Sequence, residues 1–262
     1  MLSKADPNLA SLLNSSIVDA QNMDGKSHVL LVCEHASNYI PAKYNALGLT
    51  TQEIQSHIAW DPGAMKIAGH LVEMLDAPLI AQKVSRLVYD CNRPPNSPDA
   101  MRPTSEAYSI PGNQNLTDSE KQTRIAEVYT PFRTALRQTI DQRIKAGFDP
   151  IIITIHSFTP TYNGTTRDVE IGILHDSDQR IADAMLKAAN GPYDVRRNAP
   201  YGPQDGVTHT LTDQAISRGL RNVMIEIRND LLKSADSQHE IAQWLAALIK
   251  AAILNEAAIC QE

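Results

Sequence analysis

The stretch PIIITIHS, residues 150–157, indicates the fold class of this chain. Its five consecutive Ile and Thr residues are followed directly by His156, so a strongly apolar run ends in an ionisable side chain. A run of this kind is typical of a strand that is covered on both faces, as in parallel sheets. Four more runs rich in Val and Ile share the pattern, namely HVLLVC (28–33), APLIAQKV (77–84), VEIGIL (169–174) and NVMIEI (222–227).

Helical patterns lie between these runs. One is expected from Asp61, with Asp61 as the N-cap and Pro62 in the first turn, to about residue 75. A longer one spans about 117–147, and Pro131 should kink or divide it. Further helices are expected over 178–190, over 210–218 with Gly219 as the stop, and over 237–258. This alternation predicts an α/β fold with a mainly parallel sheet between two helical layers. We expect one domain over 1–262, with an N-terminal extension over 1–26.

The composition is typical of a soluble, cytoplasmic protein that binds neither nucleic acid nor membranes. The 262 residues carry a formal net charge of −6, whereas phosphate binding needs a basic face. No stretch approaches the roughly 20 apolar residues of a membrane helix, and the N-terminus does not read as a signal peptide. Cys33, Cys91 and Cys260 are odd in number and widely spaced, so we expect neither structural disulfides nor a cysteine-based zinc cluster.

Three of the predicted strands end in ionisable residues. The first is followed by Glu34 and His35, the central one by His156, and the last contains Glu226. Ligands bind beyond the carboxyl ends of the strands in open α/β sheets, so these side chains should meet at one edge. Two imidazoles and one carboxylate are usual ligands of a catalytic zinc, and a further carboxylate can take the proton of a bound water. The alternative is that each histidine is a hydrogen-bonded structural residue.

Polar residues near the second strand extend this hypothesis. SRLVYDCNRPP places Arg86, Asn92 and Arg93 just after that strand, where an Asn-Arg pair can hold a substrate carboxylate. The alternative is that an arginine pairs with Asp90 or Asp99.

Three more segments carry candidate residues. HIAWDPGA contains Asp61, which either binds metal or only caps the following helix. TPTYNGTTRD adds Arg167, another candidate for binding an anionic group. The long loop YGPQDGVTHTL (201–211) contains His209 and is either an active-site lid or a solvated loop. The markers GxSxG, Walker A and GxGxxG are missing, which disfavours an ordinary serine hydrolase and nucleotide binding.

Taken in chain order, the motifs CEHASNYIP, SRLVYDCNRP, IHSFTP and IEIRNDL resemble those of the N-formylglutamate amidohydrolase family, from about residue 28 to 232. This resemblance implies a fold similar to zinc carboxypeptidases and aspartoacylases, with a mixed, mostly parallel sheet in a three-layer α/β/α arrangement. It implies hydrolysis of N-formyl-L-glutamate to formate and L-glutamate, a reaction of histidine degradation. It also implies zinc or another divalent metal held by His35 and His156, with Glu226 as the catalytic carboxylate. Arg86, Asn92 and Arg93 would face the carboxylates of the substrate.

Two departures from the family pattern leave choices open. Carboxypeptidase-type sites have a Glu three residues after the first His, and this chain has Asn38 there. The third metal ligand would then be Asp61, which we prefer, or Glu34. Typical members also carry Pro-His-Ser-Gly where this chain has EHAS, so other N-acyl amino acids or peptides are alternative substrates. A non-enzymatic alternative is a metal-free protein that binds acidic metabolites through Arg86, Arg93 and Arg167. The sequence does not set the oligomeric state.

Overall fold

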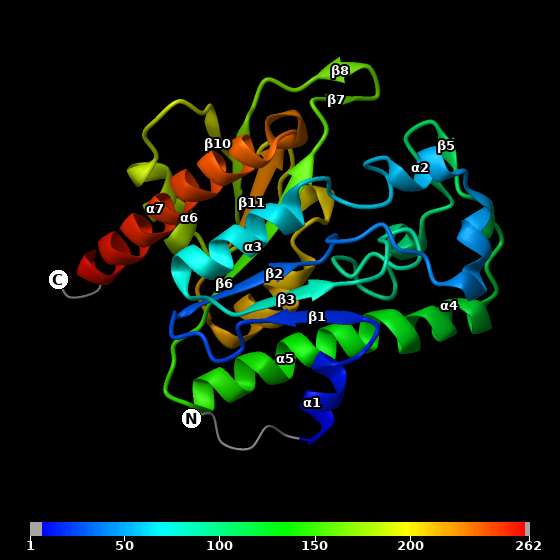
Figure 1. Ribbon diagram of the computed structural model, residues 1–262, viewed down its shortest axis with the longest axis horizontal. Helices are drawn as coiled ribbons and strands as arrows, with labels where there is room; N and C mark the ends of the chain where they lie inside the picture. The colour runs from blue at the N-terminus through cyan, green and yellow to red at the C-terminus, as the bar shows by residue number, and fades with distance from the viewer. Residues whose placement is uncertain (1–6, 260–262) are drawn as a thin grey trace.

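A seven-stranded sheet forms the centre of the molecule, seen here in a computed structural model that describes residues 7–259. Its strand order is β1-β3-β2-β6-β11-β9-β10 (Figure 1). The central strands β3, β2, β6 and β11 are parallel, as are β9 and β10, whereas β1 and β9 run antiparallel to β3 and β11. The strands are β1 (Val18–Gln21), β2 (Val29–Cys33), β3 (Leu79–Gln82), β6 (Ile151–Phe158), β9 (Ile171–Leu174), β10 (Val195–Arg197) and β11 (Asn222–Arg228). The sheet is mixed and mostly parallel, as predicted.

The structure contains all five predicted strands and adds the two edge strands β1 and β10. Only Val18 is buried in β1, and no residue of β10 is buried. An edge strand has a neighbour on one side only, so neither segment carries the continuous apolar run that marked the central strands. β1 and the helix before it come from the segment expected as an N-terminal extension.

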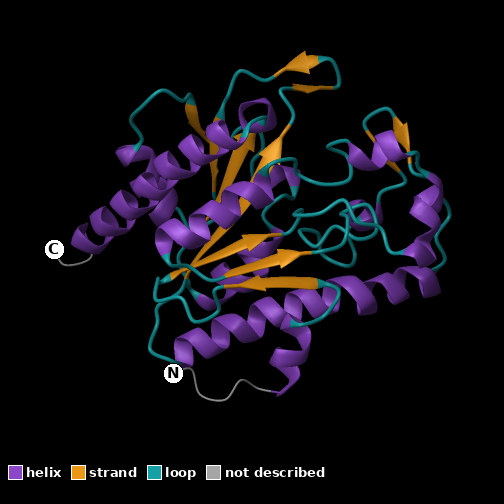
Figure 2. Cartoon of the chain, in the orientation of Figure 1, coloured by secondary structure: helices purple, strands orange, loops and turns teal. Residues whose placement is uncertain are grey.

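Helices cover both faces of the sheet and give three layers (Figure 2). One layer contains α3 (Ala64–Leu75), α6 (Arg180–Ala188) and α7 (Ala235–Ile259), and the other contains α1 (Pro7–Leu13) and α5 (Thr130–Lys145). Successive strand residues face opposite layers: Leu31 packs in the cluster with α3, and Leu30 in the cluster with α5. No helix within residues 7–259 is both long and apolar enough to span a membrane.

Helix α3 begins at Ala64 and not at Asp61, so a capping role for Asp61 is wrong. Its N-cap is Gly63, at φ +83°, and no side chain caps the helix. A Cβ at position 63 would lie 2.6 Å from the Cβ of Leu232, so both the close approach and the positive φ require glycine. The side chain of Asp61 is therefore available for other contacts.

The helix expected over 117–147 is interrupted just before Pro131 by a π-helical turn, Ile125–Tyr129. This turn joins α4 (Asp118–Arg124) to α5, and the N–H of Thr130 bonds to the C=O of Ile125, five residues earlier. A proline offers no N–H to the preceding turn, and a widened turn accommodates the missing bond.

The segment expected as a helix over 210–218 is irregular. It consists of a π-helical turn, Leu211–Ala215, and a 3-10 turn, Ile216–Arg218. It stops at Gly219, at φ +69°, as predicted. In these irregular turns Leu211 packs against Leu174 of β9 and Met224 of β11. This packing fixes the end of the long loop 201–210.

Short elements border the edge of the sheet at which the central strands end. They are α2 (Thr51–Gln55), the hairpin of β4 (Thr104–Ser105) and β5 (Tyr108–Ser109), and the hairpin of β7 (Thr161–Tyr162) and β8 (Thr165–Thr166). Figure 1 shows both hairpins projecting beyond the sheet. Ser105, Glu106 and Tyr162 from these hairpins line a pocket at this edge.

Candidate metal centre

Three predicted site residues converge on one point at this edge. Oδ2 of Asp61 lies 3.1 Å from Nδ1 of His35 and 2.8 Å from Nδ1 of His156. All three potential ligand atoms lie within 4.8 Å of one another. His35 and Asp61 are each 3% exposed and His156 is 2% exposed. The predicted meeting of the two histidines and Asp61 is therefore present in the structure.

The sheet positions these side chains. β2 ends at Cys33, and the chain turns there, so Glu34 and His35 both reach towards His156 although they are adjacent in sequence. The backbone C=O of His35 accepts a hydrogen bond from the N–H of Asp61, which ties the segment before α3 to the end of β2.

Glu226 lies beside this cluster. In the parallel pair of β6 and β11, Glu226 is in register with His156, so both side chains project from the same face of the sheet. Arg228, two residues further along β11, instead donates to Asp230 and to the backbone of Asp168.

Each histidine has a second carboxylate at its other ring nitrogen. Nε2 of His35 lies 2.7 Å from Oδ1 of Asp90, and Nε2 of His156 lies 3.1 Å from Oε2 of Glu34. Metal-binding histidines commonly have a carboxylate on the nitrogen that does not bind the metal, because it fixes the orientation and tautomer of the ring. Both rings therefore present Nδ1 towards Asp61, while Nε2 of His35 hydrogen-bonds to Asp90 and Nε2 of His156 forms an ion-pair contact with Glu34.

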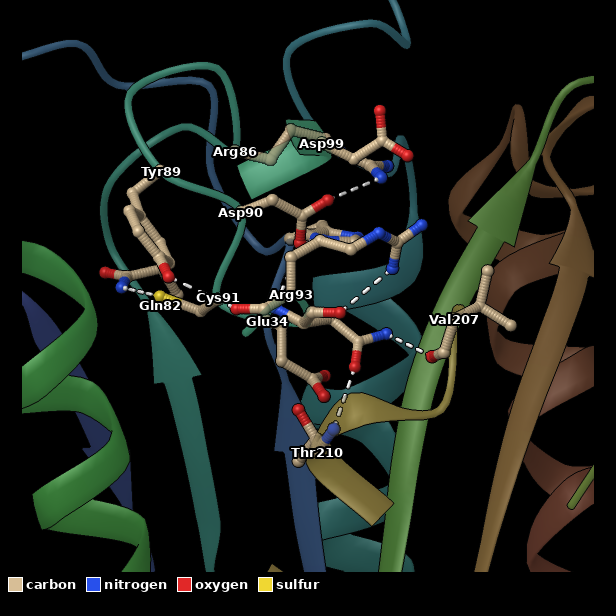
Figure 3. Close-up of polar contacts among 12 residues, drawn as sticks. Glu34, Gln82, Arg86, Tyr89, Asp90, Cys91, Arg93, Asp99, Val207 and Thr210 are labelled. Atoms are coloured by element: carbon tan, nitrogen blue, oxygen red, sulfur yellow. Dashed lines mark hydrogen bonds and ion pairs between the residues drawn. The ribbon is translucent and has the colours of Figure 1, made fainter. Parts of the chain in front are cut away.

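Arg86 completes this network. It donates to Oδ1 of Asp61 and to Oδ2 of Asp90, at 3.1 Å in each case. Arg86 therefore pairs with Asp90, as the alternative interpretation of the sequence predicted, and the same guanidinium also donates a hydrogen bond to Asp61. Figure 3 shows Arg86, Asp90 and Arg93 gathered above Glu34.

The pKa values of the buried groups reflect this crowding. Burial alone would lower the pKa of His156, but Glu34 and Asp61 hold it well above its usual value. Burial alone would raise the pKa of Asp61, but His35, His156 and Arg86 hold it well below its usual value. Asp61 is therefore ionised, and a protonated His156 must lose its proton before Nδ1 can bind a metal.

Glu226 behaves differently from Asp61. Burial raises the pKa of Glu226 to about 7; His156 opposes the shift and Asp61 adds to it. Its Oε2 is buried and accepts no hydrogen bond from residues 7–259. A carboxyl group of this kind can both accept and release a proton near neutral pH.

The side chains present fit a divalent metal. Two imidazole nitrogens and one carboxylate oxygen are the ligand set of a common class of catalytic zinc site. Of the buried carboxylates Glu34, Asp61 and Asp90, Arg86 contacts the last two, so once His156 has lost its proton a cation at this point would balance the remaining negative charge. Glu34 faces the back of His156 and not the point where the two Nδ1 atoms converge.

A cavity of about 400 Å³ opens next to the cluster, and its size suits a small molecule. His35, Asp61, His156 and Glu226 form part of its wall. Of the predicted substrate-binding residues, Arg86, Asn92 and Arg93 also line it.

Asn92 lines the pocket, but its amide is already engaged. Nδ2 donates to the C=O of Val207 and Oδ1 accepts from the N–H of Thr210. Asn92 therefore anchors the loop 201–210. His209 points away from the pocket towards Tyr129, whose hydroxyl lies 2.9 Å from Nε2, and it borders a separate small cavity.

Arg167 lies among aromatic rings at the rim. Its guanidinium lies 4.6 Å from the ring centre of Tyr162 and 4.7 Å from that of Tyr201, within cation–π range. Both tyrosines line the pocket. Arg167 thereby joins the β7–β8 hairpin to the 201–210 loop.

The sequence hypotheses missed several residues of the metal centre and of the pocket. Asp90 was considered only as a possible ion-pair partner of an arginine, although its position four residues after Arg86 could have indicated its contact with that side chain. Arg102 and the pair of His57 and Glu106, whose ring nitrogen and carboxylate oxygen are in contact, lie on loops without a recognisable pattern. Cys33 and Cys91 are buried thiols, and Cys260 lies outside the described residues.

Comparisons with known proteins identify the family and support the fold. A family model described as N-formylglutamate amidohydrolase matches residues 27–233. A search of curated proteins gives no match. The crystal structure of a gene product from Agrobacterium tumefaciens is similar with a TM-score of 0.91 and 51% identity, covering 94% of this chain and 98% of that one. An N-formylglutamate amidohydrolase from Ralstonia eutropha JMP134 shares the fold, with a TM-score of 0.60 and 15% identity over 92% of this chain and 98% of that one.

Proposed function

The chain belongs to the N-formylglutamate amidohydrolase family, and on that premise we propose that it is a metal-dependent hydrolase of N-acyl acidic amino acids. The reference reaction converts N-formyl-L-glutamate and water to formate and L-glutamate. One observation carries the proposal: Nδ1 of His35, Nδ1 of His156 and Oδ2 of Asp61 converge beside a pocket that contains arginines.

In this proposal His35, His156 and Asp61 hold zinc or another divalent ion, which supplies an activated water and polarises the substrate carbonyl when bound. Asp90 and Glu34 hold the opposite ring nitrogens and keep both imidazoles in the tautomer that leaves Nδ1 available. Glu34 is therefore assigned to orienting His156 and not to the ligand set.

Glu226 is proposed to take the proton of the water and pass it to the leaving amine. It projects from the same face as His156 and lines the pocket. Its raised pKa, about 7, suits a group that accepts a proton in one step and gives it up in the next.

Arg93 is proposed to bind a substrate carboxylate. It lines the pocket, and its guanidinium donates a hydrogen bond to the backbone C=O of Asn92, not to an acidic side chain. The contacts of Asn92 and His209 instead favour structural roles for these two residues.

A cytoplasmic location is also part of the proposal. Cys33 and Cys91 are both free thiols, as is usual in a reducing compartment.

Formate release from N-formyl-L-glutamate by the metal-loaded protein tests the proposal. Glu226→Gln should reduce kcat on the order of a hundredfold to ten-thousandfold while the metal content stays unchanged. The matched control is Glu240→Gln, on the exposed face of α7. Full activity in Glu226→Gln would remove Glu226 from the mechanism. Protein that neither binds metal nor hydrolyses any of a panel of N-acyl amino acids would leave only the metabolite-binding alternative.

A further inference from the structure

Four arginine side chains gather at the pocket, and two of them already have partners for their charge. Arg86 lies between the carboxylates of Asp61 and Asp90. Arg167 lies over the rings of Tyr162 and Tyr201. These two guanidinia therefore serve the protein itself.

The remaining two arginines, Arg93 and Arg102, line the pocket, and within residues 7–259 neither hydrogen-bonds to a carboxylate. Arg93 donates to a backbone carbonyl. Arg102 forms a long ion pair with Asp99, at 3.8 Å, and the Asp99 side chain is 54% exposed. Burial lowers the pKa of Arg102, and the like charges of Arg86 and Arg93 add to the shift, whereas Asp90 and Asp99 oppose it.

Arg102 is nevertheless held firmly through its backbone. Nδ2 of Asn113 donates to the C=O of Arg102 and to the C=O of Leu87, at 2.9 Å in each case. Oδ1 of Asn113 in turn accepts from Arg124 at 2.6 Å. Asn113 and Arg124 are each 4% exposed. A buried scaffold of this kind limits the ordering that a ligand would otherwise have to impose on the segment.

Two further acidic residues of the pocket wall have partners of their own. Glu106 contacts the ring of His57, and Asp205 accepts from the N–H of Gly202. The guanidinia of Arg93 and Arg102 therefore keep donors available for a ligand, and two such groups in one pocket match two carboxylates of one ligand, because arginine binds a carboxylate through a planar fork of donors.

We propose that Arg102 is a specificity-determining residue that binds the side-chain carboxylate of the substrate, while Arg93 binds its α-carboxylate. This inference rests on the proposed function, and it deepens it by naming the residue that selects substrates with an acidic side chain. An uncharged amide in place of that carboxylate would leave the guanidinium of Arg102 without its partner.

The first test compares N-formyl-L-glutamate with its neutral isostere N-formyl-L-glutamine. In Arg102→Gln, we expect kcat/KM for the glutamate substrate to fall on the order of 10- to 100-fold, mainly through KM. The value for the glutamine substrate should change little, so that discrimination between the two is lost. Arg102→Lys keeps the positive charge but lacks the planar fork of donors, so this variant should retain part of the discrimination between the two substrates. Equal losses on both substrates would overturn the proposal.

A binding experiment separates this inference from the proposed function. The zinc-loaded wild type should bind glutarate at least about tenfold more tightly than the monoamide of glutarate, by calorimetry, and Arg102→Gln should lose this preference. Arg137 is exposed on α5, outside the pocket. Arg137→Gln removes the same charge and should keep the preference for glutarate. Glutarate binding that is unchanged in Arg102→Gln would overturn the inference even in an active enzyme. An Arg102-dependent preference in a protein that hydrolyses no N-acyl amino acid would support the inference and remove the proposed function.

Discussion

Oε2 of Glu34 lies 3.1 Å from Nε2 of His156, on the side of the ring opposite the nitrogen that faces Asp61. This relationship bears on a choice that the sequence left open. A single metal at the meeting point of the two Nδ1 atoms leaves Glu34 behind His156, where a carboxylate orients the ring and raises its basicity. We therefore expect the loss of Glu34 to weaken a metal site without abolishing it.

Glu34→Gln keeps the shape of the side chain but removes its charge. Loss of a carboxylate behind a metal-binding histidine typically costs about 10- to 100-fold in metal affinity. We expect a loss of this size, measured by competition with a chromophoric chelator. Glu73→Gln, on the exposed face of α3, should leave the affinity unchanged. Complete loss of stoichiometric binding would instead assign Glu34 to the ligand set.

Asp61→Asn tests whether Asp61 is the third metal ligand, because asparagine keeps the size of the side chain and removes its charge. A neutral amide replaces the carboxylate that both Nδ1 atoms face, so stoichiometric zinc should no longer survive gel filtration, by elemental analysis. The exposed Asp24→Asn should retain the metal. Retention of one zinc per chain by Asp61→Asn would move the third ligand elsewhere.

Asn92→Ala should act mainly on stability. Removing the buried amide leaves the C=O of Val207 and the N–H of Thr210 without their partner, at a cost of about 1 to 3 kcal/mol in the free energy of unfolding. Urea denaturation measures this, with the exposed Asn96→Ala as control. A raised KM with an unchanged urea midpoint would mean that Asn92 binds substrate instead.

Glu226 should give the metal-free protein a specific pH dependence. Burial raises the pKa of Glu226 from its ordinary value of about 4.5 to about 7 in the folded state. The folded state therefore holds the proton more tightly than the unfolded chain does. This stabilisation is fully present below about pH 4.5 and is lost as the pH rises through about 7.

Glu226→Gln lacks this titration. Relative to wild type, the metal-free variant should gain on the order of 2 to 3 kcal/mol between about pH 4.5 and pH 8. Chemical denaturation of chelator-treated proteins across this range gives the difference, and Glu240→Gln should follow the wild type. Parallel stability curves for wild type and Glu226→Gln would show that the pKa of the Glu226 carboxyl group is not raised in the folded state.

The sequence predicted the central strands and the meeting of His35 and His156 because both depend on local patterns, whereas Asp61 was preferred as the third ligand on the resemblance to the family. A buried parallel strand must be apolar along its whole length, so its end is visible in the sequence. The edge strands β1 and β10 have little burial and so carried no such signal.

The roles of loop residues could not be read in the same way. Whether an asparagine binds substrate or the backbone depends on which loop passes beside it, and Val207 is 115 residues from Asn92. The position of Arg102 in the pocket could not be predicted from the sequence for the same reason. Its place in the pocket is set by Asn113 and Arg124, two buried residues in segments that look unremarkable by composition.

The segment Asp90-Cys91-Asn92 has a consequence for attempts to change the specificity of this protein. Asp90 contacts Nε2 of His35. Two residues later, Asn92 donates a hydrogen bond to the C=O of Val207, in the loop that also contains Tyr201. Exchanging residues 201–210 for the loop of a relative would therefore disturb the histidine as well as the pocket wall, unless the graft kept the carbonyl at 207 and the amide at 210. Variation in substrate range is more accessible through the two hairpins, whose tips do not share a hydrogen bond with this segment within residues 7–259.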